Sequence, residues 1–529
     1  MPNSNVFPRA PKGKVIPQTD AVNAAGGVAY ALSPEQALAT YACTGTINNT
    51  FYTTAEQQFS DVLQMCEKVS PEFIAKTAVY ARTKGYMKDM PCLLLAVLLT
   101  KDTSLFKRIF PKVIDNVKML RSFVQILRSG ALGRKSFGTV VTNCIRNWFD
   151  SWDDADKLFN SSVGSNPSLA DIIRLAHPKP KDETFSALFA YLCGFPHDPA
   201  KLPANVRLYE HFKKDYAEGK SWDALPNINF QYLTSVPLTR ENWVSIAKDA
   251  SWQTTRMNLN AFQRNGVFDR NGEDPVLVNM IFDRLRNPEE IAKSKIFPYT
   301  LLSAYIMTET IPHKVREALQ DAMELSISNV PKIEGKVIVA IDVSGSMQHP
   351  VTGSRGSGTT MVKCVDVAGL MGAAIKRMNT DAVIISFDTV VHWEKINPRD
   401  SVMTNAQKLS RNGGGTDTGC AIKYLNDNNI RGDLLVIVSD DMSWFNSGSR
   451  WDYRMSTPAQ QEWTTFNYNN PGAKCVCIDI QPTNATQLKE SADIINVGGF
   501  SDAVFDLLAA VARGSGKDTF VNLINSVEI

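Results

Sequence analysis

The stretch that decides the fold is VIVAIDVSGSMQHP, residues 337–350. Five apolar residues come first, and Asp342, Ser344 and Ser346 then stand at alternate positions. A short, nearly continuous β-branched run is typical of a strand buried on both faces of a parallel sheet. The sequence therefore predicts one carboxylate and two hydroxyls at the carboxyl end of a buried strand.

The same kind of short apolar run recurs up to the end of the chain. Further short apolar runs follow as DAVIISFD, DLLVIVSD, AKCVCIDI and DIINV, separated by helical patterns such as TTMVKCVDVAGLMGAAIKRMN and SDAVFDLLAAVAR. Apolar strands that alternate with helices indicate a parallel sheet covered on both faces. We expect a doubly wound α/β domain over residues 335–529.

The polar residues after the first strand predict a metal site. Ligands of open parallel sheets bind beyond the carboxyl ends of the strands, and alternate spacing aims side chains the same way. Hard oxygen ligands suit Mg²⁺, which recruits few carboxylates. Thr416, in RNGGGTDTG, and Asp440, at the end of DLLVIVSD, would complete the set with Asp342, Ser344 and Ser346. The alternative is a serine-rich turn with incidental acids.

The region before residue 335 has a different pattern. Residues 1–20 are rich in Pro, Asn and Lys and predict an extended arm. Over residues 21–334, segments such as SPEQALATYAC and SPEFIAKTAVYARTKG carry apolar residues at three- and four-residue spacing behind capping Ser or Thr. Helix pairs of roughly 35 to 45 residues predict a HEAT-like α-solenoid.

Composition restricts the class of protein. The chain has 529 residues, 44% hydrophobic and 21% charged, so several folded domains are expected. Its nine scattered cysteines favour a reducing compartment and no structural zinc. The N-terminus lacks a signal-peptide core, and no run of about 18 apolar residues occurs. We expect a cytoplasmic protein that does not span a membrane.

Two apparent catalytic motifs are set aside. RGSGKDTF, near residue 513, lacks the first glycine of a phosphate-binding loop, and Lys517 is followed by an aspartate that would repel phosphate. SGSM, around Ser344, lacks the G-x-S-x-G elbow of a nucleophilic serine. The sequence therefore predicts no catalytic residue.

Positive charge is concentrated in one stretch. Residues 101–146 hold ten lysines and arginines against two acids, although the whole chain is only +2. Within this stretch, Arg134 and Lys135 lie in the glycine-flanked turn GALGRKSFG. Such a region can neutralise RNA phosphates, so affinity would fall with salt. The alternative is a solvated helix face.

Two resemblances extend this interpretation. The five predicted metal ligands resemble the metal-ion-dependent adhesion site of von Willebrand factor A domains. NAAGGVAYALSPEQALATYACTGTINNTFY (23–52), LRSGALGRKSFGTVVTNCIRNWF (127–149), PSLADIIRLAHPKP (167–180) and KSKIFPYTLLSAY (293–305) resemble blocks of the TROVE module. In this order, the chain resembles the Ro autoantigen family over nearly its whole length.

The Ro resemblance implies a ring of HEAT-like repeats closed by the A domain. It also implies Y-type small noncoding RNA on the outer basic surface and single-stranded 3′ ends of misfolded RNA in the hole. An exoribonuclease such as polynucleotide phosphorylase is an implied partner, with a Y-type RNA as tether. Since one chain can form such a ring, we expect a monomer.

The resemblance also nominates RNA contacts. His177 in RLAHPKP matches an R-L-x-H block, with Arg174 and Lys179 as electrostatic helpers; the alternative for a lone histidine is a helix-end role. The basic stretch supplies four further candidates, Arg121, Arg128, Arg134 and Lys135, and Lys84 of YARTKGYMKDMP is a candidate outside that stretch. The chain departs from animal members at NSSVGSNPSL, where no charge occurs from residue 160 to 170.

Three functions are compatible with these patterns. The first is a non-catalytic RNA-binding protein for RNA quality control or processing. The second is a Mg²⁺-dependent protein-interaction scaffold that acts through the A-domain metal site. The third, metal-promoted phosphoryl hydrolysis, is weakened because such chemistry commonly needs more carboxylates, a second metal or a general base.

Overall fold

The computed structural model describes residues 16–220, 225, 228–268, 275–294, 296, 298–308, 310–327, 330–354, 361–393, 395–410, 413–444, 456–514 and 519–529. Most of the predicted N-terminal arm and Lys517 lie outside these residues. The chain forms two compact units. The first comprises Met1–Met90, Pro288–Met307 and Leu319–Glu528, and the second comprises Pro91–Asn287, Thr308–Ala318 and Ile529. The domain boundaries at residues 20 and 334 stay predictions.

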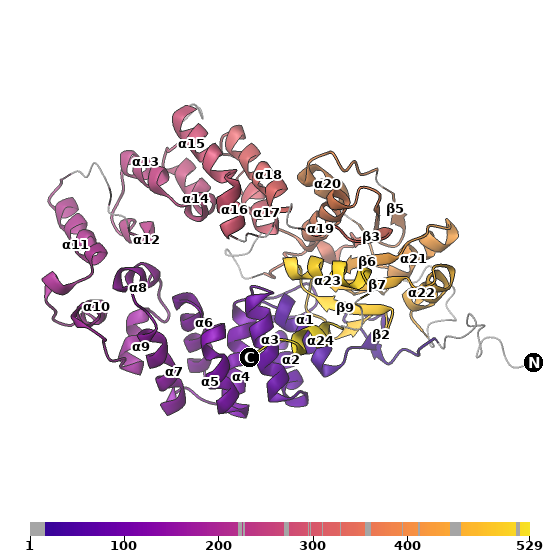
Figure 1. The fold of residues 1–529 in the computed structure, drawn as a ribbon, viewed down its shortest axis with the longest axis horizontal. Helices are drawn as coiled ribbons and strands as arrows, with labels where there is room; N and C mark the ends of the chain where they lie inside the picture. Colours follow the sequence, from indigo (N-terminus) through magenta and orange to yellow (C-terminus); the bar gives the residue numbers. More distant parts are fainter. Residues whose placement is uncertain are drawn as a thin grey trace, which may run out of the picture. The chain divides into compact units, whose positions relative to one another are not determined.

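A helical region precedes an α/β region, as the sequence predicts (Figure 1). The helices before residue 335 are α1 (Pro34–Thr44), α2 (Ala55–Lys68), α3 (Pro71–Thr83), α4 (Asp89–Lys101), α5 (Thr103–Val113), α6 (Val117–Arg128), α7 (Gly138–Asp150), α8 (Ala155–Ser161), α9 (Leu169–Ala176), α10 (Glu183–Cys193), α11 (Ala204–Ala217), α12 (Phe230–Leu233), α13 (Arg240–Asp249), α14 (Trp252–Arg264), α15 (Pro275–Leu285), α16 (Pro288–Ser294), α17 (Pro298–Ile306) and α18 (His313–Ile327).

Side-chain caps explain where several helices begin. The hydroxyls of Ser33, Thr54 and Ser70 accept hydrogen bonds from backbone N–H groups in the first turns of α1, α2 and α3. Asp102 and Asn116 cap α5 and α6 in the same way. These caps satisfy amides that have no partner within the helix, so the predicted start signals are confirmed.

The second unit packs its helices through aromatic side chains. Phe106 and Phe110 of α5 lie against Phe123 of α6, with ring centroids 5.9 and 5.6 Å from it. Helix α7 contacts α5 and α9, and α9 contacts α6 and α10. Each helix buries one apolar face against its neighbours, as expected for stacked helical pairs.

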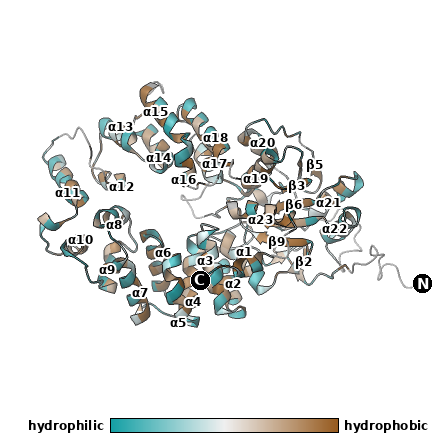
Figure 2. Cartoon of the chain, in the orientation of Figure 1, coloured by the Kyte–Doolittle hydropathy of each residue, from teal (hydrophilic) through white to brown (hydrophobic). Residues whose placement is uncertain are grey.

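A six-stranded mixed sheet forms the centre of the first unit. Its order is β5-β4-β3-β6-β7-β9, and only β5 runs antiparallel. The strands are β3 (Val337–Asp342), β4 (Val383–Phe387), β5 (Val391–His392), β6 (Leu434–Ser439), β7 (Lys474–Asp479) and β9 (Ile494–Gly498). The apolar residues concentrate on these strands and on the inner faces of the helices (Figure 2). The predicted doubly wound core is confirmed, with one additional antiparallel edge strand.

Helices cover both faces of this sheet. Ile338 and Ala340 of β3 belong to a core cluster with α21 (Thr418–Asp427) and α22 (Pro458–Asn469). Ile341 points to the other face, where it contacts Gly372 of α19 (Cys364–Met378). The remaining helices of this region are α20 (Val402–Leu409), α23 (Asp502–Ala512) and α24 (Phe520–Asn525), with short 3₁₀ turns at Pro199–Lys201 and Ser346–Gln348. Alternate residues of one strand therefore enter two cores.

The N-terminal segment adds a small second sheet. Strands β1 (Ala21–Val22) and β2 (Val28–Ala31) form a hairpin, and β2 pairs antiparallel with β8 (Ala485–Thr486). Tyr30 is fully buried and hydrogen-bonds Ser456 at 2.8 Å. The segment that precedes the first helix is therefore part of the α/β core.

Candidate functional site

The loops of the predicted metal site are joined by backbone hydrogen bonds. Asp342 ends β3, and its Oδ1 accepts a hydrogen bond from the Ser344 N–H at 2.8 Å. The Ser344 and Ser346 hydroxyl oxygens lie 3.3 Å apart. Gly345 donates to the Gly414 carbonyl, and Gly413 donates to the Val343 carbonyl, each at 2.8 Å. These bonds fix the loop before Thr416 against the D-x-S-x-S turn.

Thr416 and Asp440 reach the same end of the sheet from two other loops. The Thr416 carbonyl accepts hydrogen bonds from the Trp444 N–H and the Ser443 hydroxyl, both at 3.2 Å. Asp440 follows β6 directly, and its carboxylate hydrogen-bonds Ser346. All five predicted ligands are buried, with at most 4% exposure. The structure thus brings the three segments together, whereas the role of the five residues as metal ligands stays a prediction.

Three further polar residues were missed by the sequence reasoning. The Ser439 hydroxyl donates to Asp342 Oδ2 at 2.6 Å. Asp441 and Asp479 are buried beside the site. A signal was available, because the neighbouring parallel strands β3, β6 and β7 all end at or next to an aspartate in the printed sequence. Carboxyl ends of parallel strands meet at one edge, so these acids had to converge.

Burial governs the electrostatics of this acidic cluster. It raises the pKa of Asp342 and of Asp479, and it raises the pKa of Asp440 and of Asp441 to about 7. The nearby charge of Asp342 adds to the effect on Asp440, while the hydrogen bond from Ser346 opposes it. Several carboxylates without a counter-charge are costly in a buried site. A bound cation would remove that cost.

The donor set fits a hard cation. Among the described residues, no three His, Cys, Asp or Glu side chains are grouped so that they could hold a metal ion by themselves. The five predicted ligands instead combine two carboxylates with three hydroxyls, the mixture that leaves Mg²⁺ several waters. Asp479 Oδ2 is buried without a hydrogen-bond partner in the described part of the chain. This orphaned oxygen is consistent with a missing positive charge.

A tyrosine from the helical region borders the predicted metal site. Tyr52, in the connection between α1 and α2, shares a hydrogen bond with Ser346 and lies near Asp440 and Asp342. Burial raises its pKa, the two acids raise it further, and the Ser346 hydrogen bond opposes them. Sequence reasoning missed Tyr52 because no local pattern marks a contact with so distant a segment.

The connection that carries Tyr52 is fastened to the chain beyond the D-x-S-x-S turn. The Thr46 hydroxyl and the Asn48 amide both donate to the Thr352 carbonyl, at 2.6 and 2.7 Å. Asn49 and Ser354 exchange two backbone hydrogen bonds. The ring of Phe51 lies edge-on to His349, with centroids 6.1 Å apart. Residues 46–52 therefore form a strap over one side of the site.

Three predicted RNA-contact arginines are held by backbone carbonyls. Arg121 donates to the carbonyls of Pro167, Val163 and Ser165, at 2.7, 3.1 and 2.5 Å. Arg134 donates hydrogen bonds within its own turn, to the carbonyls of Ser136 and Phe137. Arg174 donates to the Cys193 carbonyl at 2.7 Å. Each guanidinium thus has a structural role. Arg121 also supplies a positive charge to the segment 160–170, which has none of its own.

The other nominated residues are exposed. Arg128 ends α6 and lies near Asp171 of α9. His177 caps α9 in a left-handed conformation with φ of 48°, and Lys179 follows it. Lys135 is exposed in the turn before α7, and Lys84 caps the end of α3 in the first unit. Arg128, Arg174 and His177 therefore gather around α9, where their contact with RNA stays a prediction.

The fold and the site define a class of protein: a helical-repeat region followed by a von Willebrand A-type domain. Residues 336–511 match the family model described as the Ro60 vWA domain. The chain is 25% identical to the RNA-binding protein RO60 of Deinococcus radiodurans, over 95% of this chain and 97% of the relative. Over nearly its whole length the chain is therefore similar to a Ro protein.

Two further similarities concern the fold and part of the sequence. The crystal structure of the Deinococcus radiodurans RO (RSR) protein matches 91% of this chain and 100% of its own, with a TM-score of 0.61 and 21% identity. The RNA-binding protein RO60 of Caenorhabditis elegans is 24% identical over 185 residues, 32% of this chain and 28% of the relative. Within the described residues, no helix is long and apolar enough to cross a membrane.

Proposed function

We propose that this protein is a non-catalytic RNA-binding protein. The observation that carries the proposal is the group of basic side chains around α9: Arg128 at the end of α6, Arg174, His177 and Lys179. Relatives named RNA-binding proteins support it. Exposed cations of this kind neutralise phosphates and release counterions, which gives affinity that depends steeply on salt.

The proposal extends to the kind of RNA. We take the ligands to be a Y-type small noncoding RNA and the single-stranded 3′ ends of misfolded RNA, in quality control or processing with an exoribonuclease such as polynucleotide phosphorylase. The full-length similarity to a Ro protein supports this extension. The protein would act in the cytoplasm as a monomer.

The test is binding to a structured RNA with and without a single-stranded 3′ tail, across a salt series. The variant Arg128→Glu with Lys135→Glu should weaken binding and reduce the slope of log affinity against log salt by roughly one per lost phosphate contact. Lys395→Glu with Arg399→Glu, two exposed residues of the α/β region, is the charge-matched control. Equal losses in both double variants would remove α9 and its neighbours from the interface.

The acidic cluster supports a second candidate function, a scaffold that binds a partner carboxylate through Mg²⁺. Asp342, Ser344, Ser346 and Thr416 would hold the ion, with Asp440 directly or through water. The bound ion would supply an open position for an oxygen of the partner. Trp444, 48% exposed, lies beside Gly415 and offers apolar contact area there.

Metal binding separates the two candidates. Isothermal titration with Mg²⁺ should show binding that Asp342→Asn abolishes, while RNA affinity is retained if the two sites act independently. Loss of RNA affinity in Asp342→Asn would place the metal in the RNA-binding function. An absence of metal binding in the unaltered protein would end the scaffold hypothesis.

A further inference from the structure

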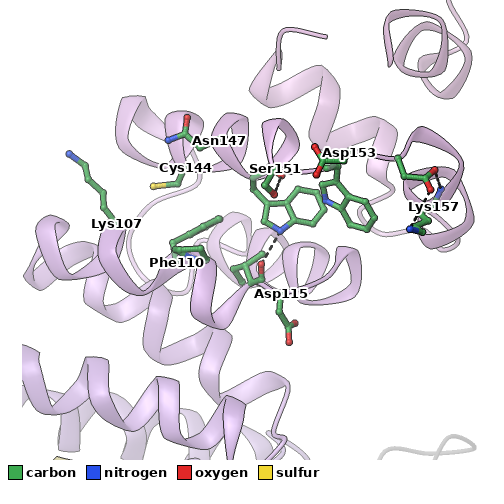
Figure 3. A pocket seen from close by; sticks show the side chains of 13 residues that line it. Lys107, Phe110, Asp115, Cys144, Asn147, Ser151, Asp153 and Lys157 are labelled. Atoms are coloured by element: carbon green, nitrogen blue, oxygen red, sulfur yellow. Dashed lines mark hydrogen bonds and ion pairs between the residues drawn. The ribbon is translucent and has the colours of Figure 1, made fainter. Parts of the chain in front are cut away.

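A cavity of about 620 Å³ opens between α5, α7 and α8 in the second unit. It is lined by Lys107, Phe110, Pro111, Ile114, Asp115, Cys144, Asn147, Trp148, Ser151, Trp152, Asp153, Asp154 and Lys157. Figure 3 shows Lys107 at one end of the lining side chains and Lys157 at the other. The volume lies in the range of pockets that bind small organic groups.

Two indole rings form the wall of this cavity. The rings of Trp148 and Trp152 lie 5.4 Å apart at 65°, so they make a steep corner. Trp148 is fixed in place, because its indole N–H donates to the Ile114 carbonyl at 2.8 Å. Trp152 is only half-buried. Because Trp148 is only 7% exposed, a planar ring can stack on the indole of Trp152 while its edge meets the exposed part of Trp148.

Polar groups on α5 and α7 point to a ligand with hydrogen-bonding edges. In the part of the chain that the structure describes, neither the side-chain amide of Asn147 nor the ammonium of Lys107 has a protein partner, and both residues are exposed. An amide offers a donor and an acceptor side by side, which is the pairing that reads the edge of adenine. An ammonium is suited to a phosphate.

Two of the three acids that line the cavity, which are Asp115, Asp153 and Asp154, are paired with lysines. Asp153 pairs with Lys181 at 3.2 Å, and Asp154 pairs with Lys157 at 3.5 Å. Lys107, Lys157 and Lys181 together equal the three acids in number, and this charge balance favours a neutral ring in the cavity over a cationic side chain. Lys181 also donates to the Trp152 carbonyl, so the segment that begins at His177 and Lys179 adjoins the cavity.

We propose that this cavity binds one unpaired base of a single-stranded RNA, and that Asn147 favours adenine. The base stacks in the corner of Trp148 and Trp152, and its strand continues past Lys107 and the segment 177–181. Stacking on aromatic side chains is how proteins hold bases that are free of a duplex. The inference rests on the proposed RNA-binding function and adds a base-binding position to it.

The first experiment uses a single-stranded RNA decamer in which 2-aminopurine replaces one adenine. Stacking should quench its fluorescence on binding to the full-length protein. Trp152→Ala should abolish the quenching and weaken affinity by about 5- to 150-fold, the usual effect of losing one stacked base. Trp152→Phe should retain most of both. Trp393→Ala, which removes a 55% exposed tryptophan of the α/β region, is the matched control.

A second measurement does not depend on altering the aromatic wall. Cys144 lines the cavity and is half-buried, and besides it only Cys420 among the nine cysteines is not buried. In a Cys420→Ser protein, bound oligoadenylate should slow alkylation of Cys144 at least severalfold, and Asn147→Ala should reduce the preference for oligoadenylate over oligouridylate.

The outcomes separate this inference from the proposed function. RNA that binds tightly without quenching and without protection of Cys144 overturns the base pocket and leaves RNA binding intact. Failure of every RNA to bind the unaltered protein overturns the proposed function, and the base pocket with it. Protection of Cys144 by an arginine-rich peptide but not by RNA assigns the cavity to a cationic ligand and overturns the inference.

Discussion

The hydroxyl of Tyr52, from the connection between α1 and α2, shares a hydrogen bond with Ser346 of the D-x-S-x-S turn. A residue of the helical region therefore engages a predicted metal ligand of the α/β region, within one compact unit. A proton donated by Tyr52 to the Ser346 oxygen would occupy a lone pair that a cation needs, and in that arrangement the two interactions compete.

Removal of the Tyr52 hydroxyl should therefore strengthen metal binding. We expect Tyr52→Phe to bind Mn²⁺ about 2- to 12-fold more tightly, which corresponds to the net value of one hydrogen bond, about 0.5–1.5 kcal/mol. Isothermal titration measures it, with the exposed Tyr468→Phe as control. Weaker binding in Tyr52→Phe would mean that the hydroxyl helps to hold the ion.

Stabilisation by Mg²⁺ should depend on pH. Burial raises the pKa of Asp342, Asp440 and Asp441 above that in the unfolded chain, to about 7 for the last two. The folded state then binds more protons than the unfolded state between about pH 4 and 7, so stability falls as pH rises through this window. A bound cation offsets the loss.

The rise in Tm caused by Mg²⁺ should thus be large near pH 8 and small near pH 5. Thermal unfolding with and without the ion measures it, and Asp342→Asn should flatten both the Mg²⁺ effect and the pH dependence of the metal-free protein. Asp400→Asn, which removes an acid that pairs with Lys408 outside the acidic cluster, is the control. An Mg²⁺ effect that is equal at both pH values would contradict the assignment of the cation to these acids.

Arg121→Ala should lower stability because it leaves three carbonyls of the segment 163–167 without their donor. We expect a loss of about 2–4 kcal/mol in the free energy of unfolding, given the value of hydrogen bonds to charged groups. Urea unfolding measures it, with the exposed Lys118→Ala on the same helix as control. An unchanged midpoint would return Arg121 to the set of free RNA-contact residues.

Gly498→Ala should separate α1 from the sheet. A Cβ at Gly498 would lie 2.5 Å from the Cα of Thr40 in α1, so backbone must move. We expect a cost of about 1–3 kcal/mol, typical of overpacking, and faster amide exchange in α1. Gly414→Ala, where no atom lies within 4 Å of the added Cβ, is the steric control. Unchanged amide exchange in α1 would show that the helix moves to accommodate the added Cβ without a loss of stability.

Local patterns predicted the fold well where they were long. Five apolar residues before Asp342 predicted strand β3, and the capping residue Ser33 predicted the start of α1. The pairs β1–β2 and β2–β8 could not be predicted, because strands of two to four residues carry no readable alternation.

The candidate site, like the fold, could be predicted only in part from the sequence. Its five predicted ligands converge because they follow strands or loops at one sheet edge, a rule of topology. The contact of Tyr52 with Ser346 and the bonds of Arg121 depend on which distant segments meet, which no residue spacing encodes. A charged residue in a basic stretch can either hold backbone carbonyls or remain exposed for RNA. Only the structure shows that Arg121 does the first and that Arg128 is exposed.

The pairing of β2 with the region around β8 can form only late in the synthesis of the chain. Gln487 donates to the carbonyl of Val28, which was made 459 residues earlier. At the usual rates of translation, roughly 5–20 residues per second, the amino-terminal hairpin waits about 20–90 s on the ribosome before its partner emerges. During that interval its unpaired edge is open to other chains, so a nascent-chain chaperone would find its substrate there.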